Sequence, residues 1–117
     1  WPENRAPSIV NIFLNGLSWK KDHFLTKDTI VNLNFEFEQY NNNSLEIDYV
    51  LYPEAFSNKM GGDFQESPDP INLNIIERNS NQVSFKSPSK KGAYRIFTFI
   101  TNEYGQSSVA NVPFLVN

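Results

Sequence analysis

The chain has 117 residues, of which 39% are hydrophobic, 15% aromatic and 20% charged, and its formal net charge at pH 7 is −3. This length corresponds to one domain, the ten phenylalanines argue against intrinsic disorder, and the lack of a basic footprint excludes nucleic-acid binding. The absence of cysteine excludes disulfides, thiolate metal sites and cysteine nucleophiles, and no apolar run approaches the ~20 residues of a membrane span.

A linker and two strands are predicted in the first third of the chain. Residues 1–7 contain two prolines and no periodic pattern, which is typical of a linker that precedes a domain. A strand is predicted over 8–14 and a second one over 29–38. The second prediction depends on the run 31–37, where apolar and polar residues alternate as in a strand with one face in the core.

The same two-residue period recurs along the rest of the chain. Further strands are predicted over 45–52, 71–76, 82–86, 93–101 and 107–116. Turn-forming residues separate these runs, and no window favours an amphipathic helix. Segment 53–70, which is rich in proline and glycine, is predicted to be a long loop, and loops of this length are often functional.

Seven short strands divided by turns predict the fold class. We expect an all-β protein, a seven-stranded antiparallel immunoglobulin-like β-sandwich, in which residues 8–117 form a single module.

No residue pattern typical of an active site occurs in the sequence. The single histidine, His23, lies in a polar stretch, and we expect it at the surface. Asp63, Glu66 and Asp69 do not follow the spacing of a calcium-binding loop and are expected to be solvated. Motifs for phosphate binding, zinc proteases and serine hydrolases are absent from the sequence. We therefore expect that this module is not an enzyme and has no cofactor and no metal site.

Five short motifs, in the same order along the chain, resemble those of a known module. They are Asn4–Pro7, Pro53-Glu54, Gly61–Phe64, Gly92–Phe97 and Ala110–Phe114. Over nearly its whole length the sequence is similar to PKD-type and related immunoglobulin-like accessory modules, which are appended to large secreted bacterial glycoside hydrolases.

The sequence departs from this pattern at two places. The turn at 39–44 is commonly acidic in such modules and can hold Ca²⁺, but here it contains no carboxylate, which argues against a metal at this turn. The third strand usually carries an inward tryptophan, and here Tyr49 takes that position. We expect Tyr49 to fill the same place in the core and its hydroxyl to need a hydrogen-bond partner.

The resemblance implies a function and a location. It implies a non-catalytic accessory module of a secreted carbohydrate-active enzyme, which binds a polysaccharide or oligosaccharide or orients the catalytic domain. The location implied is secreted, periplasmic or at the cell surface. The alternative is a structural spacer or an adhesin-type module that contacts adjacent domains of the same protein.

The first candidate binding surface is the tip formed by the loops after the second and sixth strands. Its candidate ligand-binding residues are Tyr40, Asn42, Asn102 and Tyr104, because aromatic faces stack on sugar rings and amides bond hydroxyls. Alternatively, the tyrosines cover the ends of the core and the asparagines form turns. Trp19 is a further aromatic candidate, although cation–π contact with the adjacent lysines or edge packing explains it equally well.

The second candidate surface is the outer face of the sheet that carries the third, sixth and seventh strands. Alternate residues of 94–100 are expected to point inward, which places Phe97 and Phe99 outward, with Tyr52 beside them. Outward aromatic side chains need a cover. Three covers remain open: the 53–70 loop, a neighbouring domain, or a glycan chain.

Overall fold

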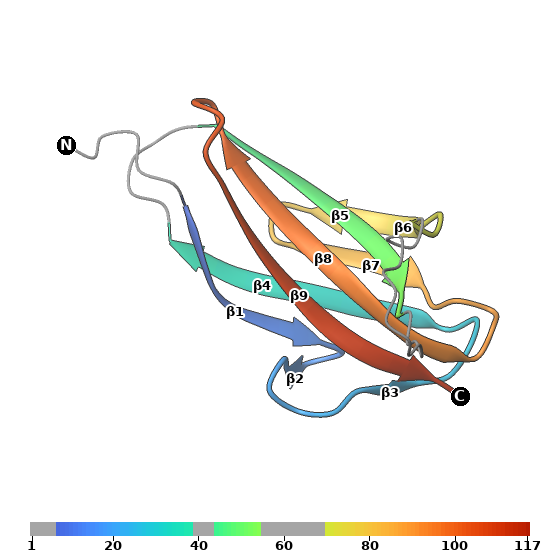
Figure 1. Cartoon of the computed structure of the whole chain (residues 1–117). Helices are drawn as coiled ribbons and strands as arrows, with labels where there is room; N and C mark the ends of the chain where they lie inside the picture. Colours follow the sequence, from blue (N-terminus) through green and yellow to red (C-terminus); the bar gives the residue numbers. More distant parts are fainter. Residues whose placement is uncertain (1–6, 39–43, 55–69) are drawn as a thin grey trace, which may run out of the picture.

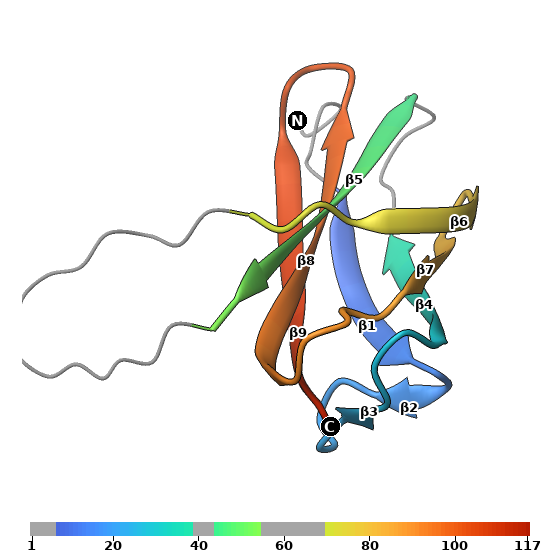
Figure 2. The same cartoon turned by 90° about the vertical axis from the view of Figure 1, so that its right-hand side faces the viewer.

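The computed structural model describes residues 7–38, 44–54 and 70–117, which are all-β (Figure 1). The bounds of its nine strands are β1 (Ser8–Leu14), β2 (Leu17–Ser18), β3 (Phe24–Leu25), β4 (Ile30–Glu38), β5 (Leu45–Pro53), β6 (Asn74–Asn79), β7 (Gln82–Lys86), β8 (Gly92–Asn102) and β9 (Ser107–Val116). They form a five-stranded sheet in the order β2-β1-β4-β7-β6 and a four-stranded sheet in the order β3-β9-β8-β5. Figures 1 and 2 show the two sheets as the layers of a β-sandwich.

The described residues form nine strands, whereas the sequence predicted seven. The two additional strands, β2 and β3, have two residues each, and so short a strand has no readable period. β2 follows a tight turn in which Asn15 and Gly16 have φ of 52° and 79°, as in hairpin turns with two left-handed residues. The fourth predicted strand was displaced: β6 spans 74–79 rather than 71–76, because Ile71 forms only an isolated bridge to Leu51.

The core lies between the two sheets and confirms the inward faces that the two-residue period indicated. In β4, Val31, Leu33 and Phe35 are fully buried, and in β8 all alternate residues of 94–100 are buried. The apolar side chains that form the core are Ile12, Leu14, Leu25, Val31, Leu33, Phe35, Leu51, Val83, Phe85, Tyr94, Ile96, Ile100, Val112, Phe114 and Val116.

The four-stranded sheet ends at β3, which runs parallel to β9. The backbone N–H groups of Leu115 and Asn117 donate to the carbonyls of His23 and Leu25 at 3.0 and 2.9 Å. Because its carbonyl is bonded to β9, His23 lies against the sandwich. Its side chain is buried, and its Nε2 donates to the Ser18 carbonyl at 3.0 Å. The prediction that His23 lies at the surface was therefore wrong.

Tyr49 on β5 packs against the core, as expected, but its hydroxyl has no hydrogen-bond partner in the part of the chain that the structure describes. Its ring contacts Phe35 edge-on at 6.5 Å between centroids, and the Arg78 guanidinium lies 5.4 Å from the ring centroid. Among the described residues, none bonds the buried Tyr49 hydroxyl. Burial raises the pKa of this hydroxyl to about 12, although the positive charge of Arg78 acts in the opposite direction.

Replacing Tyr49 with phenylalanine is expected to leave the free energy of unfolding at neutral pH unchanged or higher, because an unpaired buried hydroxyl is removed. The same variant should lose less stability in alkali. The pKa of the Tyr49 hydroxyl is about 12 in the folded chain and about 10 in the unfolded chain. Above about pH 10 the tyrosine therefore ionises more readily in the unfolded chain than in the folded one. The free energy of unfolding is unaffected by this group below about pH 10 and falls as pH rises towards 12.

Urea unfolding of both proteins at neutral pH and in steps above pH 9 measures both effects. Burial also raises the pKa of Tyr94, so this residue lowers the free energy of unfolding of both proteins in alkali. A clear loss of stability at neutral pH in Tyr49→Phe would contradict the interpretation, since it would show that the hydroxyl is bonded.

Candidate functional site

The outer face of the four-stranded sheet carries three aromatic side chains in contact, which we call the aromatic face. Tyr52 extends from β5, and Phe97 and Phe99 extend from the neighbouring strand β8. The ring centroids of Tyr52 and Phe97 are 5.5 Å apart at an interplanar angle of 88°. Those of Phe97 and Phe99 are 6.3 Å apart at 20°. All three side chains are half-buried, so the structure brings together the residues that the sequence placed on this face.

Three polar side chains meet beside the aromatic face, and we call them the polar cluster. The Arg95 Nε donates to Glu54 Oε2 at 2.5 Å, and its Nη1 donates to Asn111 Oδ1 at 2.6 Å. Each side chain comes from a different part of the sheet: Arg95 from β8, Asn111 from β9, and Glu54 from the residue that follows β5. Arg95 and Glu54 retain 37% and 28% of their side-chain exposure, so the cluster is accessible to solvent.

The polar cluster is the part of the candidate site that sequence reasoning missed. Glu54 and Asn111 lie in two of the motifs that carry the family resemblance, but they are far apart in the chain. The strand pairing brings them together. Phe97 lies opposite Asn111, Tyr52 lies opposite Arg95, and the Glu54 N–H donates to the Ala93 carbonyl at 2.9 Å.

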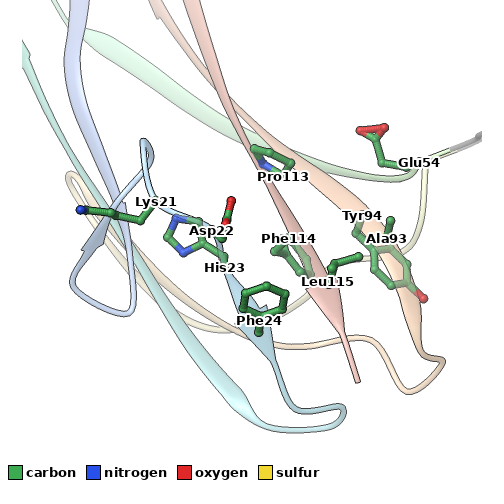
Figure 3. A pocket seen from close by; sticks show the side chains of 10 residues that line it. All are labelled: Lys21, Asp22, His23, Phe24, Glu54, Ala93, Tyr94, Pro113, Phe114 and Leu115. Atoms are coloured by element: carbon green, nitrogen blue, oxygen red, sulfur yellow. The ribbon is translucent and has the colours of Figure 1, made fainter.

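A shallow pocket of about 170 Å³ continues this face toward β3 (Figure 3). The residues that line it are Lys21, Asp22, His23, Phe24, Glu54, Ala93, Tyr94, Pro113, Phe114 and Leu115. Phe24 and Leu115 are opposite each other in the β3–β9 pair and are 61% and 43% exposed. Glu54 belongs to both the pocket and the polar cluster, so the two are contiguous.

At the predicted tip, the described residues include Asn102 and Tyr104. The Asn102 Oδ1 accepts hydrogen bonds from the backbone N–H groups of Tyr104 and Gln106 at 2.9 and 3.0 Å, and its side chain is buried. Asn102 therefore stabilises the turn between β8 and β9. Tyr104 is exposed, whereas Tyr40 and Asn42 lie outside the described residues, so glycan binding at the tip stays a prediction.

The remaining sequence candidates have different outcomes. Trp19 is 44% exposed, with the Lys20 Nζ 5.8 Å from its ring centroid, as expected for a cation–π contact. Segment 55–69 lies outside the described residues, and with it Asp63, Glu66, Asp69 and the predicted loop cover. Within the described ranges, no group of three histidine, aspartate or glutamate side chains is placed to hold a metal ion. The same ranges contain no helix of sufficient length and hydrophobicity to cross a membrane.

The sequence matches no protein-family model and no curated protein. It is similar in structure to a nucleoside hydrolase-related hypothetical protein from Saccharophagus degradans that is associated with carbohydrate metabolism. That likeness has 17% sequence identity and a TM-score of 0.61, and covers 97% of this chain and 26% of the other. A DUF4784 family protein from Bacteroides caccae is 16% identical with a TM-score of 0.47, over 92% of this chain and 24% of that one. The first likeness shows a shared fold, and this chain spans about a quarter of the length of either protein.

Proposed function

We propose that the chain is a non-catalytic, immunoglobulin-like accessory module of a secreted carbohydrate-active protein, and that the aromatic face and the polar cluster bind glycan. The strand order supports the fold assignment. When the short strands β2 and β3 are set aside, the sheets read β1-β4-β7-β6 and β9-β8-β5. These are the ABED and GFC orders of immunoglobulin constant domains.

The observation that carries the proposal is the position of Arg95, Glu54 and Asn111 next to Tyr52 and Phe97. A sugar ring has an apolar C–H face, which packs on an aromatic ring, and a rim of hydroxyls, which need fixed donors and acceptors. The aromatic face and the polar cluster supply both requirements on one accessible surface. Ligand sites in general combine apolar and aromatic walls with a few well-placed polar groups.

The polar cluster is preorganised and electrically balanced. Arg95 is held from two sides by Glu54 and Asn111, so little side-chain entropy is lost when a ligand binds. A guanidinium has five N–H donors, and those that no described residue occupies remain for ligand hydroxyls. The Glu54 carboxylate compensates the charge of Arg95, which favours a hydroxyl-rich ligand over a polyanion.

The structural neighbour gives independent support for a module within a larger protein. The fold of this chain corresponds to 26% of that neighbour, whose description associates it with carbohydrate metabolism. A module that binds polymer near a catalytic domain raises the effective concentration of substrate without taking part in the reaction.

Affinity gel electrophoresis against a panel of soluble neutral polysaccharides tests the proposal. We expect retardation by at least one polysaccharide, lost in Phe97→Ala and kept in Tyr104→Ala. Ile76→Ala is the matched control, because Ile76 is an exposed apolar residue of β6 in the other sheet. Retardation that is lost only in Tyr104→Ala would place the site at the tip, and no retardation by any polysaccharide would contradict glycan binding.

The spacer or adhesin-type module remains the second candidate function, and one observation favours it. Val109 lies opposite Phe99 on the outer face and is 54% exposed, so this surface is also suited to contact with an adjacent domain. In that case no polysaccharide retards the module, and Phe97→Ala weakens its association with the separately produced neighbouring domain.

A further inference from the structure

The aromatic face, the polar cluster and the pocket of Figure 3 lie along one continuous strip of the four-stranded sheet. The outward residues of β8 follow one another from Phe99 through Phe97 and Arg95 to Ala93. Their partners on β9 are Val109, Asn111, Pro113 and Leu115. At the rise of about 3.3 Å per residue in a strand, the strip is roughly 20 Å long, which is several sugar rings.

The end of the strip at β3 has its own apolar surface. Figure 3 shows Phe24 near Leu115 at one end of the pocket and Pro113 and Glu54 at the other. Glu54 is itself a member of the polar cluster. Phe24 is 61% exposed, although an aromatic residue of this size is usually covered. Lys21, Asp22 and Glu54 place charged groups around it.

Resting on the proposed function, we propose that the pocket at Phe24 is a second sugar-binding subsite, and that the module binds an extended glycan along the chain rather than a terminal sugar. The pocket has about 170 Å³, which is below the roughly 300 Å³ of pockets that enclose a small molecule. A sugar therefore contacts it with one face only. Phe24 at one end of the strip and Val109 at the other are both exposed, so an extended chain can pass beyond both ends.

Glu54 connects the two subsites. Its Oε2 accepts from the Arg95 Nε at 2.5 Å, and its side chain also lines the pocket. Because Glu54 belongs to both the polar cluster and the lining of the pocket, a glycan that occupies both subsites contacts it. Because both subsites act on one ligand, contact with the second adds affinity without a second loss of translational freedom.

Isothermal titration calorimetry with a ladder of oligosaccharides, from dimer to hexamer, tests the proposal. The probes are cello-, xylo-, manno- and laminari-oligosaccharides, and the series used is the one whose parent polysaccharide retards the protein. We expect the affinity of the native sequence to rise at least tenfold from dimer to hexamer. In Phe24→Ala this rise is expected to vanish while the dimer affinity stays the same, and Ile76→Ala is the control.

Leu115→Ala provides a second test, because it removes an exposed side chain of the pocket and leaves the backbone bond from Leu115 to the His23 carbonyl in place. It is expected to reduce the rise as Phe24→Ala does. Equal affinity for dimer and hexamer, or an unchanged rise in both variants, would overturn the second subsite while the proposed function stands. Failure of every polysaccharide to bind would overturn the proposed function and the subsite together.

Discussion

Replacing Arg95 with alanine is expected to lower the affinity for polysaccharide by about 10- to 100-fold. The guanidinium supplies charged N–H donors, and a hydrogen bond to a charged group contributes about 1.5–3 kcal/mol, with 1.4 kcal/mol equal to a factor of ten. The substitution also releases Glu54 and Asn111, which Arg95 holds in place. Titration calorimetry with the polysaccharide that retards the native protein measures the loss.

Two further variants separate the geometry of Arg95 from its charge. Arg95→Lys keeps a positive charge near Glu54, but an ammonium cannot bond Glu54 and Asn111 as a planar fork does, so an intermediate affinity is expected. Lys86→Ala removes an exposed charge from β7 in the other sheet and should have no effect. Full affinity in Arg95→Ala would show that the polar cluster is not part of the site.

Replacing Phe35 with alanine is expected to lower the free energy of unfolding by about 3–5 kcal/mol. Phe35 is fully buried in β4, and its ring contacts those of Phe37 and Tyr49 at centroid distances of 5.8 and 6.5 Å. The surrounding strands are fixed by their hydrogen bonds and cannot close the cavity. A domain of this kind has a total stability of roughly 5–15 kcal/mol, so urea unfolding should show a large shift of the midpoint.

Phe97→Ala is the informative comparison for Phe35→Ala. Phe97 is half-buried on the outer face, so its removal leaves no internal cavity and should cost clearly less stability. If both variants lost the same stability, Phe97 would be a structural residue, and its effect on glycan binding would no longer locate the site. The Phe35→Leu variant, which keeps most of the apolar volume, should lie between the native protein and Phe35→Ala.

The two-residue period predicted the faces of the long strands from the sequence. In β8, alternation placed alternate residues of 94–100 in the core and Phe97 and Phe99 outside, and the structure confirms both. The pairing of the third, sixth and seventh predicted strands in one sheet, here β5, β8 and β9, was also correct. These features are predictable because a shift of one residue would exchange the buried and exposed faces.

The contacts that depend on register could not be predicted in this way. The meeting of Glu54, Arg95 and Asn111 requires the alignment of three strands, which hydrophobic pattern alone does not supply. The displacement of β6 has a similar cause. Apolar residues alternate through Ile71, Leu73 and Ile75, and this pattern predicts a strand over 71–76. In the structure the residues of β6 are exposed and its register with β7 shifts after Ile75, so the apolar pattern does not mark its bounds.

The position of β9 determines how the domain responds to tension. β9 is bonded along its length to β8 on one side and, near its end, to the parallel strand β3 on the other. The start of β1 and the end of β9 lie toward opposite ends of the sandwich (Figure 1). A pull applied between them acts along β9 and loads these hydrogen bonds in shear, so that many must break together. The strand that carries Asn111 and Pro113 therefore shares this load with β1, which is hydrogen-bonded to β4 along its length.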